Sequence, residues 1–217
     1  MTTIAPALLG ADPLALADAI SDVERAPVEL LHLDVMDGNF VRDISFGLNT
    51  VRAVRKRTAL PLDVHLQVQG PERLLDDLAD IGVETVSVHV ESTQHLSICL
   101  EQLAAAGVGR GVVVNPATPL SAVEEVLDRV SQVMVMTCNP GTSTFLPATL
   151  DKIKRLRALL DGRGLPSVKI VADGGIKEAR IKELAEAGAD VLVAASAVFK
   201  STHGDAAAAF AALHAAI

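Results

Sequence analysis

The sequence predicts a single α/β domain that spans residues 1–217 and folds as a (β/α)8 TIM barrel. Short apolar runs alternate with longer amphipathic segments along the whole chain, and this alternation predicts parallel strands joined by helical crossovers. Eight such units follow one another without a linker, as in a closed barrel with outer helices. A doubly wound open sheet is the alternative, but the first strand-to-helix turn lacks the Gly-x-Gly-x-x-Gly fingerprint.

The eight predicted strands are short apolar runs. Taken together they are more continuous than alternating in apolar residues, which is typical of strands that are covered on both faces. In chain order they span 4–9, 30–36, 62–68, 84–90, 109–114, 133–136, 168–172 and 191–194. A long connection over 37–49 contains Phe40 and Phe46, and a loop of this length in a compact domain is often functional.

The predicted helices lie between these runs, and several begin at residues that favour a helix start. Asp12 before Pro13 predicts an N-cap for the first helix, because aspartate accepts hydrogen bonds from free N–H groups and proline donates none. Pro71 opens the third helix in the same way. The last segment is rich in alanine, the best helix former. The helices span 14–25, 51–57, 70–81, 95–106, 120–130, 147–160, 177–187 and 206–217.

Composition limits the classes of function. Of the 217 residues 50% are hydrophobic, and the formal net charge is −8. No basic run could neutralise phosphates, so we expect a small-molecule partner and no nucleic acid. The N-terminus has no basic leader and no apolar run could span a bilayer, so we expect a cytoplasmic protein without a membrane partner. Cys99 and Cys138 predict free thiols rather than a disulfide framework.

Histidines and aspartates recur at the ends of three predicted strands. His32 and Asp34 share one face of the second strand, because alternate side chains point the same way. His65 lies near the end of the third strand, and Asp173 follows the seventh. A single pair would be explained as well by a core histidine beside a turn aspartate. The repetition at the active face of a barrel favours a functional site.

Two imidazoles and two carboxylates form a donor set for one divalent metal ion per chain, either zinc, iron(II), manganese or cobalt. The set is too rich in nitrogen for a calcium site. The predicted metal ligands are His32, Asp34, His65 and Asp173. His89, at the end of the fourth strand, is interpreted as a hydrogen-bonded structural residue, and Asp63 as a buried support for the site.

Six motifs spread over nearly the whole chain carry a resemblance to a known family. They are His-Leu-Asp-Val-Met-Asp-Gly at 32–38, Leu-Asp-Val-His-Leu at 62–66, Asn-Pro-Ala-Thr-Pro at 115–119, Asn-Pro-Gly at 139–141, Asp-Gly-Gly-Ile at 173–176 and Ala-Gly-Ala-Asp-Val at 187–191. Together they resemble the ribulose-phosphate 3-epimerase family. The resemblance implies a barrel of the ribulose-phosphate-binding type and a metal-dependent isomerase of the pentose phosphate pathway. Its substrates would be D-ribulose 5-phosphate and D-xylulose 5-phosphate, and we also expect a homo-oligomer.

The resemblance also implies roles for individual residues. Asp34 and Asp173 would be the acid and the base, because inversion beside a ketone needs proton-transfer groups on both sides of the substrate. The metal would stabilise the developing enediolate. The predicted substrate contacts are His65, Met36, Met136, Gly141, Thr142, Ser143, Gly174, Gly175, Ala195 and Ser196. Core packing is the alternative interpretation of the two methionines.

Four differences from the family pattern concern substrate recognition. The sequence Thr-Ser-Thr at 142–144 stands where the family has Phe-Gly-Gly-Gln, and Ala195 stands in place of glycine. Ala7 and Gln67 stand in place of serine and methionine. A 3-epimerase of another ketose or ketose phosphate is therefore an alternative, and non-catalytic sugar-phosphate binding is another. A Schiff-base aldolase fits less well, because Lys169 lies at the start of its strand. The Asp-x-Lys-x-x-Asp pattern of phosphate-sugar decarboxylases is absent.

Overall fold

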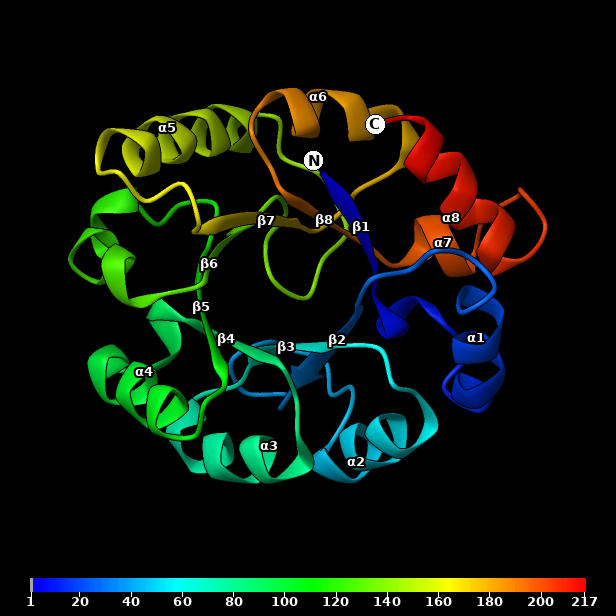
Figure 1. Ribbon diagram of the computed structural model, residues 1–217, viewed down its shortest axis with the longest axis horizontal. Coiled ribbons are helices and arrows are strands. Elements are labelled where there is room, and N and C mark those ends of the chain that lie inside the picture. Colours follow the sequence, from blue (N-terminus) through cyan, green and yellow to red (C-terminus); the bar gives the residue numbers. More distant parts are fainter. Residues whose placement is uncertain (1) are drawn as a thin grey trace.

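The computed structural model describes residues 2–217 and shows a ring of eight parallel strands surrounded by helices (Figure 1). The strands are β1 (Thr3–Pro6), β2 (Leu31–Met36), β3 (Leu62–Gln67), β4 (Thr85–His89), β5 (Gly109–Val114), β6 (Gln132–Met136), β7 (Lys169–Asp173) and β8 (Val191–Ala194). From β2 to β8 each strand pairs with the next along the chain, and β1 pairs with β8. A parallel bridge between Ala7 and His32 links β1 to β2, so the barrel is nearly closed. The predicted TIM barrel is confirmed.

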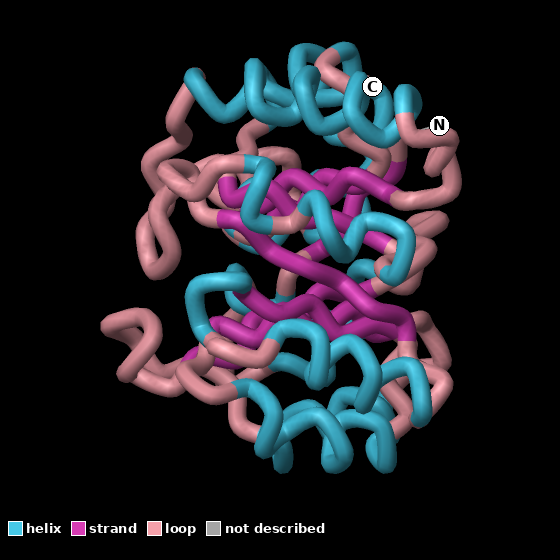
Figure 2. Tube along the Cα trace, turned by 90° about the vertical axis from the view of Figure 1, so that its left-hand side faces the viewer, coloured by secondary structure: helices cyan, strands magenta, loops and turns pink. Residues whose placement is uncertain are grey.

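Helices connect the strands and lie outside them, as the side view in Figure 2 shows. The α-helices are α1 (Leu16–Val23), α2 (Leu48–Arg57), α3 (Leu75–Ile81), α4 (Leu96–Ala105), α5 (Ala148–Gly162), α6 (Ile181–Glu186), α7 (Ser196–Phe199) and α8 (Ala206–Ala215). Short 3-10 helices are η1 (Leu8–Gly10), η2 (Pro71–Leu74), η3 (Val90–Ser92), η4 (Leu120–Ala122), η5 (Glu124–Arg129) and η6 (Glu178–Arg180). The sequence does not predict α7, which directly follows β8. Within residues 2–217 we find no helix with the length and apolar character needed to cross a membrane.

The first helix starts later than the sequence predicts. The prediction of a start at Leu14 with Asp12 as N-cap is wrong, because α1 begins at Leu16. Oδ1 of Asp12 instead accepts the N–H of Leu14 at 2.9 Å and closes a local turn ahead of the helix. The Leu14 side chain is 96% exposed. An aspartate before a proline is thus compatible with a turn as well as a cap, and sequence alone does not separate the two.

Residues 120–130 do not form the predicted α-helix. They form η4 and η5 instead, and Leu120, Val123 and Leu127 are buried there. Intervals of three and four residues between apolar positions suit a 3-10 helix as well as an α-helix. The apolar pattern therefore predicts a covered segment correctly but not its helix type. The predicted helix over 70–81 also differs from the structure, since its first turn is the 3-10 helix η2.

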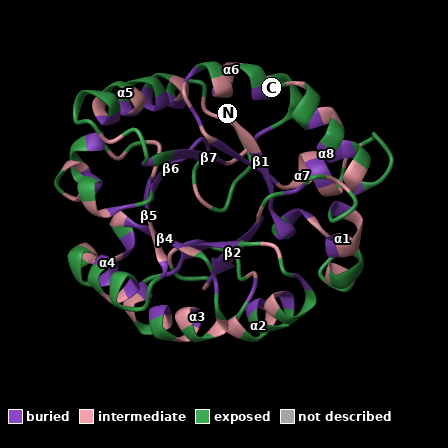
Figure 3. Ribbon diagram, in the orientation of Figure 1, coloured by how far each residue is buried: buried purple, intermediate pink, exposed green. Residues whose placement is uncertain are grey.

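Burial follows the layers of the barrel (Figure 3). The largest apolar cluster lies between the strands and the inner faces of the helices, whereas the outer helix faces are mostly exposed. Its members include Leu33, Leu66 and Leu192 from the strands and Leu100 and Leu156 from the helices. Because each strand turns these residues outward, the alternate residues point into the barrel.

The barrel interior is divided into two chemically distinct halves. The polar half comes mainly from β2, β3 and β4, with one residue each from β6 and β7, and consists of His32, Asp34, Asp63, His65, Gln67, Ser87, His89, Gln132 and Asp173. The apolar half comes mainly from β1 and β5–β8 and consists of Ala5, Ala7, Val113, Met134, Met136, Cys138, Val171, Val191 and Val193. Where the halves meet, a Cβ on Gly111 would lie 2.0 Å from Oγ of Ser87, so only glycine leaves room for that hydroxyl.

Candidate metal centre and substrate cavity

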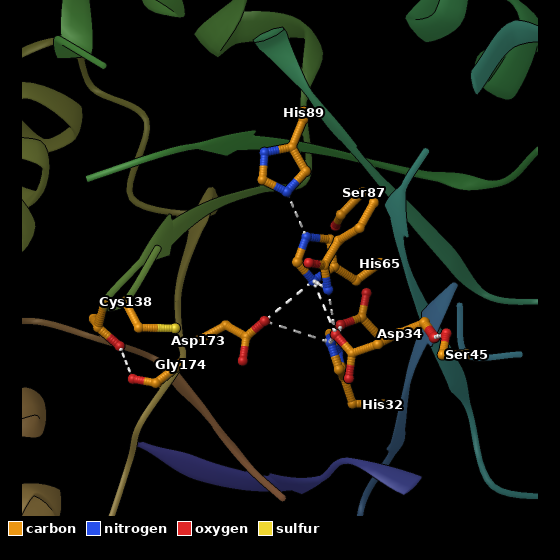
Figure 4. A network of polar contacts seen from close by, with 12 residues as sticks. His32, Asp34, Ser45, His65, Ser87, His89, Cys138, Asp173 and Gly174 are labelled. Carbon is orange, nitrogen blue, oxygen red and sulfur yellow. Dashed lines mark hydrogen bonds and ion pairs between the residues drawn. The ribbon is translucent and has the colours of Figure 1, made fainter. Parts of the chain in front are cut away.

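Four side chains from three strands meet at the end of the barrel (Figure 4). His32 and Asp34 come from β2, His65 from β3 and Asp173 from β7, and one ligand atom from each lies within 4.8 Å of the others. Nδ1 of His65 lies 3.2 Å from Oδ1 of Asp34 and 3.1 Å from Oδ2 of Asp173. Nε2 of His32 lies 3.6 Å and 3.9 Å from the same two oxygens. Ligand atoms that each lie about 2.1 Å from a tetrahedral ion are roughly 3.4 Å apart from one another. The distances between these four side chains therefore suit a single bound ion.

A neighbouring aspartate orients His32. Oδ2 of Asp63 lies 2.8 Å from Nδ1 of His32, its partner in the register of β2 and β3. Oδ1 of Asp63 accepts an N–H of Gln132 at 2.9 Å, and the same amide also donates to Oγ of Ser87. With Nδ1–H donated to Asp63, His32 keeps its lone pair on Nε2, the nitrogen that faces the other three ligands.

The donor set fits a divalent cation. Nε2 of His32 is fully buried and has no hydrogen-bond partner among residues 2–217. A buried nitrogen of this kind costs free energy unless something binds it. Two carboxylates and the second imidazole converge on that nitrogen, and together the four groups give the mixed oxygen and nitrogen ligands that zinc, iron(II), manganese and cobalt accept. The residues present therefore fit the metal ion that the sequence predicts.

The electrostatics of the cluster also favour a positive charge at its centre. Burial lowers the pKa of His32, but the Asp34 and Asp63 carboxylates outweigh it and hold that pKa well above its ordinary value. Burial likewise opposes the raised pKa of His65, which Asp173 and Asp34 produce. Burial would raise the pKa of Asp34, yet the two imidazoles hold it below the usual range. A divalent cation would replace the imidazole protons in this role.

Further contacts fix Asp34 at the end of β2. Nε2 of Gln67 donates to Oδ1 of Asp34 at 3.0 Å. The hydroxyl of Ser45 donates to the carbonyl oxygen of Asp34 and accepts the N–H of Met36 at 3.0 Å. Oε1 of Gln67 is buried and has no partner within the described part of the chain. Gln67 thus holds a carboxylate with one end of its amide and presents an unpaired acceptor with the other.

A cavity of about 600 Å³ opens above Asp34 and Asp173. The predicted contacts that line it are Met36, Met136, Gly141, Thr142, Ser143, Gly174, Gly175, Ala195 and Ser196. His65 is not among the lining residues and is fully buried, so its predicted contact with a substrate stays a prediction. Two carboxylates at the base and a ring of backbone and hydroxyl groups around the mouth suit a small polar ligand.

One side of the cavity consists of three segments, which we call the loop wall: residues 139–145 after β6, 174–177 after β7, and 195–200 after β8, which include the short helix α7. Gly174 and Gly175 have φ values of +116° and +67°. A Cβ on Gly174 would lie 2.3 Å from Sγ of Cys138, and one on Gly175 would lie 2.6 Å from the carbonyl oxygen of Ser143. The sequence predicts these glycines for close approach to an anion, but the structure shows that loop-to-loop packing already requires them.

The loop wall carries two lysines that sequence reasoning missed. Lys177 and Lys200 line the cavity, and Nζ of Lys177 donates to Oγ of Ser196 at 2.6 Å. Ala195 has a φ of −91°, so this position does not need the positive φ that favours glycine. Lysines in exposed segments carry little signal in a sequence. The one clue was that both follow predicted strand ends, in the loops where a barrel binds phosphate.

The Thr-Ser-Thr segment offers fewer free hydroxyls than its sequence implies. The Thr142 hydroxyl donates to the carbonyl oxygen of Asn139 at 2.8 Å, and the Thr142 carbonyl accepts from Sγ of Cys138 at 3.1 Å. Thr144 does not line the cavity, whereas Ser143 does. Of the three hydroxyls that could replace lost phosphate donors, Ser143 is therefore the best placed.

Solved structures confirm the architecture. The 3-keto-L-gulonate-6-phosphate decarboxylase of Vibrio cholerae superposes with a TM-score of 0.73 over 99% of this chain and 96% of its own, at 15% sequence identity. A 3-hexulose-6-phosphate synthase gives a TM-score of 0.67 over 100% and 99% of the two chains, at 21% identity. At such identities the likeness establishes the fold alone.

Relatives with higher sequence identity identify the family. The ribulose-phosphate 3-epimerase of Bacillus subtilis is 41% identical over 92% of this chain and 93% of its own. The enzyme of the same name from Escherichia coli is 36% identical over 90% and 88%. The chloroplastic ribulose-5-phosphate-3-epimerase of Arabidopsis thaliana is 42% identical over 90% and 71%. The model of the ribulose-phosphate 3 epimerase family matches residues 3–199. This chain therefore belongs to the ribulose-phosphate 3-epimerase family.

Proposed function

We propose that this protein is an isomerase that interconverts D-ribulose 5-phosphate and D-xylulose 5-phosphate by epimerisation at C3. The family and its relatives' names support this activity. The single observation that carries the mechanism is that two carboxylates from separate strands, Asp34 of β2 and Asp173 of β7, share the base of one cavity. A protein that merely binds a sugar phosphate needs no such pair.

Proton transfer is the task of the two aspartates. One carboxylate removes the proton from C3 on one face of the ketose, and the other carboxyl group returns a proton on the opposite face. Asp34 and Asp173 suit these roles because they come from different strands and approach the cluster from different sides (Figure 4). Met36 and Met136 line the cavity, where they would surround the reacting carbons without supplying a competing acid.

The metal centre complements this pair. We propose that one divalent ion, either zinc, iron(II), manganese or cobalt, is held by His32, Asp34, His65 and Asp173. When bound, such an ion supplies the positive charge that stabilises the enediolate formed when C3 loses its proton. Asp63 and Gln67 serve the site indirectly, since they hold His32 and Asp34 in place.

The loop wall is the proposed phosphate site. Backbone N–H groups after strands seven and eight of such barrels commonly bind phosphate, and here Gly174, Gly175, Ala195 and Ser196 occupy those loops. Lys177 and Lys200 add positive charge at the same side of the cavity. A phosphate held there would place the sugar carbons over the two aspartates.

A second candidate keeps the chemistry but changes the ketose. It is favoured by Gln67, whose unpartnered Oε1 is buried at the cavity. An acceptor of this kind can select a substrate hydroxyl, since leaving it unpaired costs free energy. The single-domain organisation, the cytoplasmic location and the homo-oligomeric state remain proposals alongside this function.

Solvent deuterium exchange tests the proposal. The protein is incubated in D2O with D-ribulose 5-phosphate, D-ribulose and a panel of other ketose phosphates, and proton NMR follows the C3 hydrogen. We expect deuterium at C3 together with formation of D-xylulose 5-phosphate, and neither with Asp173→Asn. Exchange in another ketose alone would support the second candidate. Binding without exchange in any ketose would contradict an epimerase.

A further inference from the structure

A chain of side chains leads from the buried candidate metal ligands to the exposed Glu91 after β4. Nε2 of His65 lies 2.8 Å from Nε2 of His89, as Figure 4 shows, and Nδ1 of His89 lies 3.2 Å from Oε2 of Glu91. The planes of the two rings are inclined to each other by 24°, and their centroids lie 4.9 Å apart. Both histidines are fully buried, and the Glu91 side chain is 24% exposed. The proposed mechanism uses neither His89 nor Glu91.

Glu91 determines which hydrogen-bonding form His89 adopts. Its Oε1 accepts the N–H of Asn115 at 2.9 Å and the hydroxyl of Thr118. Burial opposes ionisation, but the contacts with His89 and Thr118 hold the pKa of Glu91 at about 2, so it is a carboxylate at neutral pH. A carboxylate offers no hydrogen, so Nδ1 of His89 must carry the one between them.

The form of His89 then fixes that of His65. The ring of His89 is fully buried and contacts Glu91 through Nδ1, so with its hydrogen on Nδ1 the imidazole presents a lone pair on Nε2. The one hydrogen between the two Nε2 atoms therefore belongs to His65. His65 in its neutral form is left with its lone pair on Nδ1, the atom that faces Asp34 and Asp173.

We propose that Glu91, acting through His89, is a positioning residue that sets the tautomer of His65 and so presents its Nδ1 to the metal ion. The inference rests on the proposed metal centre. Glu91 would then act on His65 as Asp63 acts on His32, where Asp63 accepts the Nδ1 hydrogen and leaves the lone pair on Nε2. The two histidines thus offer opposite ring nitrogens, each selected by a carboxylate.

The far end of the chain is anchored. Nζ of Lys152 donates to the carbonyl oxygens of Asn115, Pro116 and Thr118 at 2.8, 2.7 and 2.7 Å. These three bonds use all three ammonium hydrogens and hold the loop after β5 in one conformation. That loop presents the N–H and the hydroxyl that Glu91 accepts. Glu91 is therefore held by donors that are themselves fixed in place.

A spectroscopic experiment tests the tautomers without any substitution. Long-range nitrogen–proton NMR spectra of the zinc-loaded, 15N-histidine-labelled protein report which ring nitrogen of each histidine carries hydrogen. We expect hydrogen on Nδ1 of His89 and on Nε2 of His65. The metal-free protein should show the same form of His89. Hydrogen on Nε2 of His89 in either sample would overturn the inference.

A matched pair of substitutions tests the consequence for metal binding. In Glu91→Gln the amide oxygen can still accept from Asn115, but the amide nitrogen then faces His89 and donates to its Nδ1. The hydrogen of His89 moves to Nε2, and the hydrogen of His65 moves to Nδ1. We expect the affinity for Zn²⁺, measured against a chromophoric chelator, to fall about 10- to 100-fold, as for other partners of ligating histidines. Glu72→Gln is the control, because Glu72 accepts from the Thr93 hydroxyl but does not contact the cluster. Equal affinity in the two variants would contradict the proposal.

A third variant separates a relay from a general charge effect. In a His89→Phe variant no hydrogen-bonded side chain connects Glu91 with His65. The double variant with Glu91→Gln should therefore bind Zn²⁺ as tightly as His89→Phe alone. If the second substitution still weakened binding as much as in the native background, Glu91 would act on the ion through space, and the relay would be wrong. A wild-type protein that binds no divalent ion would instead overturn the proposed metal centre, while the NMR result for His89 would still decide the tautomer.

Discussion

The polar half of the barrel and the loop wall face each other across the same cavity but are built in different ways. In the polar half, functional side chains stand on strands and contact one another directly, as His32 contacts Asp63 in register. In the loop wall the groups that line the cavity are backbone atoms and exposed side chains on loops, such as Ser143 and Lys177. The first arrangement fixes geometry through the sheet, and the second fixes it through loop packing.

The difference teaches where this fold can vary. A ligand on a strand cannot move without shifting the register of its neighbours, so the polar half tolerates little change. Loops accept substitutions if their backbone packing is kept. The Thr-Ser-Thr segment and Ala195 are changes of the second kind, and the four candidate metal ligands still lie together beside them. We therefore expect substitutions in the polar half to remove activity and those in the loop wall to alter substrate preference.

The largest effect is expected for the two aspartates. Asp34→Asn and Asp173→Asn should each lower the rate of epimerisation by at least about 100- to 10,000-fold, because an amide cannot transfer the required proton. A coupled assay for D-xylulose 5-phosphate measures the loss. The double variant should be little worse than either single one, because the two groups act as a unit. Near-native turnover in either variant with metal bound would break the two-base mechanism.

Removal of a ligand should come next. His65→Ala deletes a buried nitrogen from the cluster, and we expect the metal content of the purified protein, measured by elemental analysis, to fall well below that of the wild type. His95→Ala is the control, because His95 is exposed and lies outside the cluster. Equal metal contents in the two variants would remove His65 from the ligand set and weaken the distinction between the polar half and the loop wall.

The sequence predicted which four side chains of the polar half come together, but it did not predict the lysines of the loop wall, for a physical reason. The period of two along a strand places His32 and Asp34 on one face, and the shared end of parallel strands brings His65 and Asp173 to them. No such periodicity governs a loop. The cavity position of Lys177 depends on how three loops pack together, and local sequence does not encode that packing.

The same limit accounts for the errors in the fold. Strands were predicted well because a short, continuous apolar run between turn residues is typical of a strand that is covered on both faces. Helix starts and helix types were predicted less well. Asp12 closes a turn rather than a helix cap, and residues 120–130 form 3-10 segments, because several local conformations satisfy the same pattern of residues.

A charge change in the loop wall should have a moderate and selective effect. Lys177→Met keeps the aliphatic stem but removes the ammonium group that donates to Ser196. We expect kcat/KM for D-ribulose 5-phosphate to fall about tenfold, as for the loss of one charged hydrogen bond to an exposed phosphate. The value for unphosphorylated D-ribulose should be unchanged. Equal losses on both substrates would mean that Lys177 acts on the reaction rather than on the phosphate.

The smallest effect is expected for Ser143, and it tests how a phosphate is held by a loop with altered sequence. Thr142 donates its hydroxyl hydrogen to Asn139, and Thr144 lies outside the cavity, so Ser143 is the hydroxyl best placed to meet a phosphate. A neutral donor contributes about 0.5–1.5 kcal/mol, so Ser143→Ala should lower kcat/KM for D-ribulose 5-phosphate about two- to tenfold. Thr144→Ala is the matched control and should leave it unchanged. The Ser143 hydroxyl and Lys177 bind phosphate more weakly than a full set of backbone N–H groups. We therefore expect the wild type to have a higher kcat/KM for D-ribulose 5-phosphate than for D-ribulose, but by a smaller factor than the Phe-Gly-Gly-Gln loop of the family would give. A wild type that prefers D-ribulose would refute phosphate recognition by the loop wall, and the comparison between the two sides of the cavity would then concern two parts of a free-sugar site.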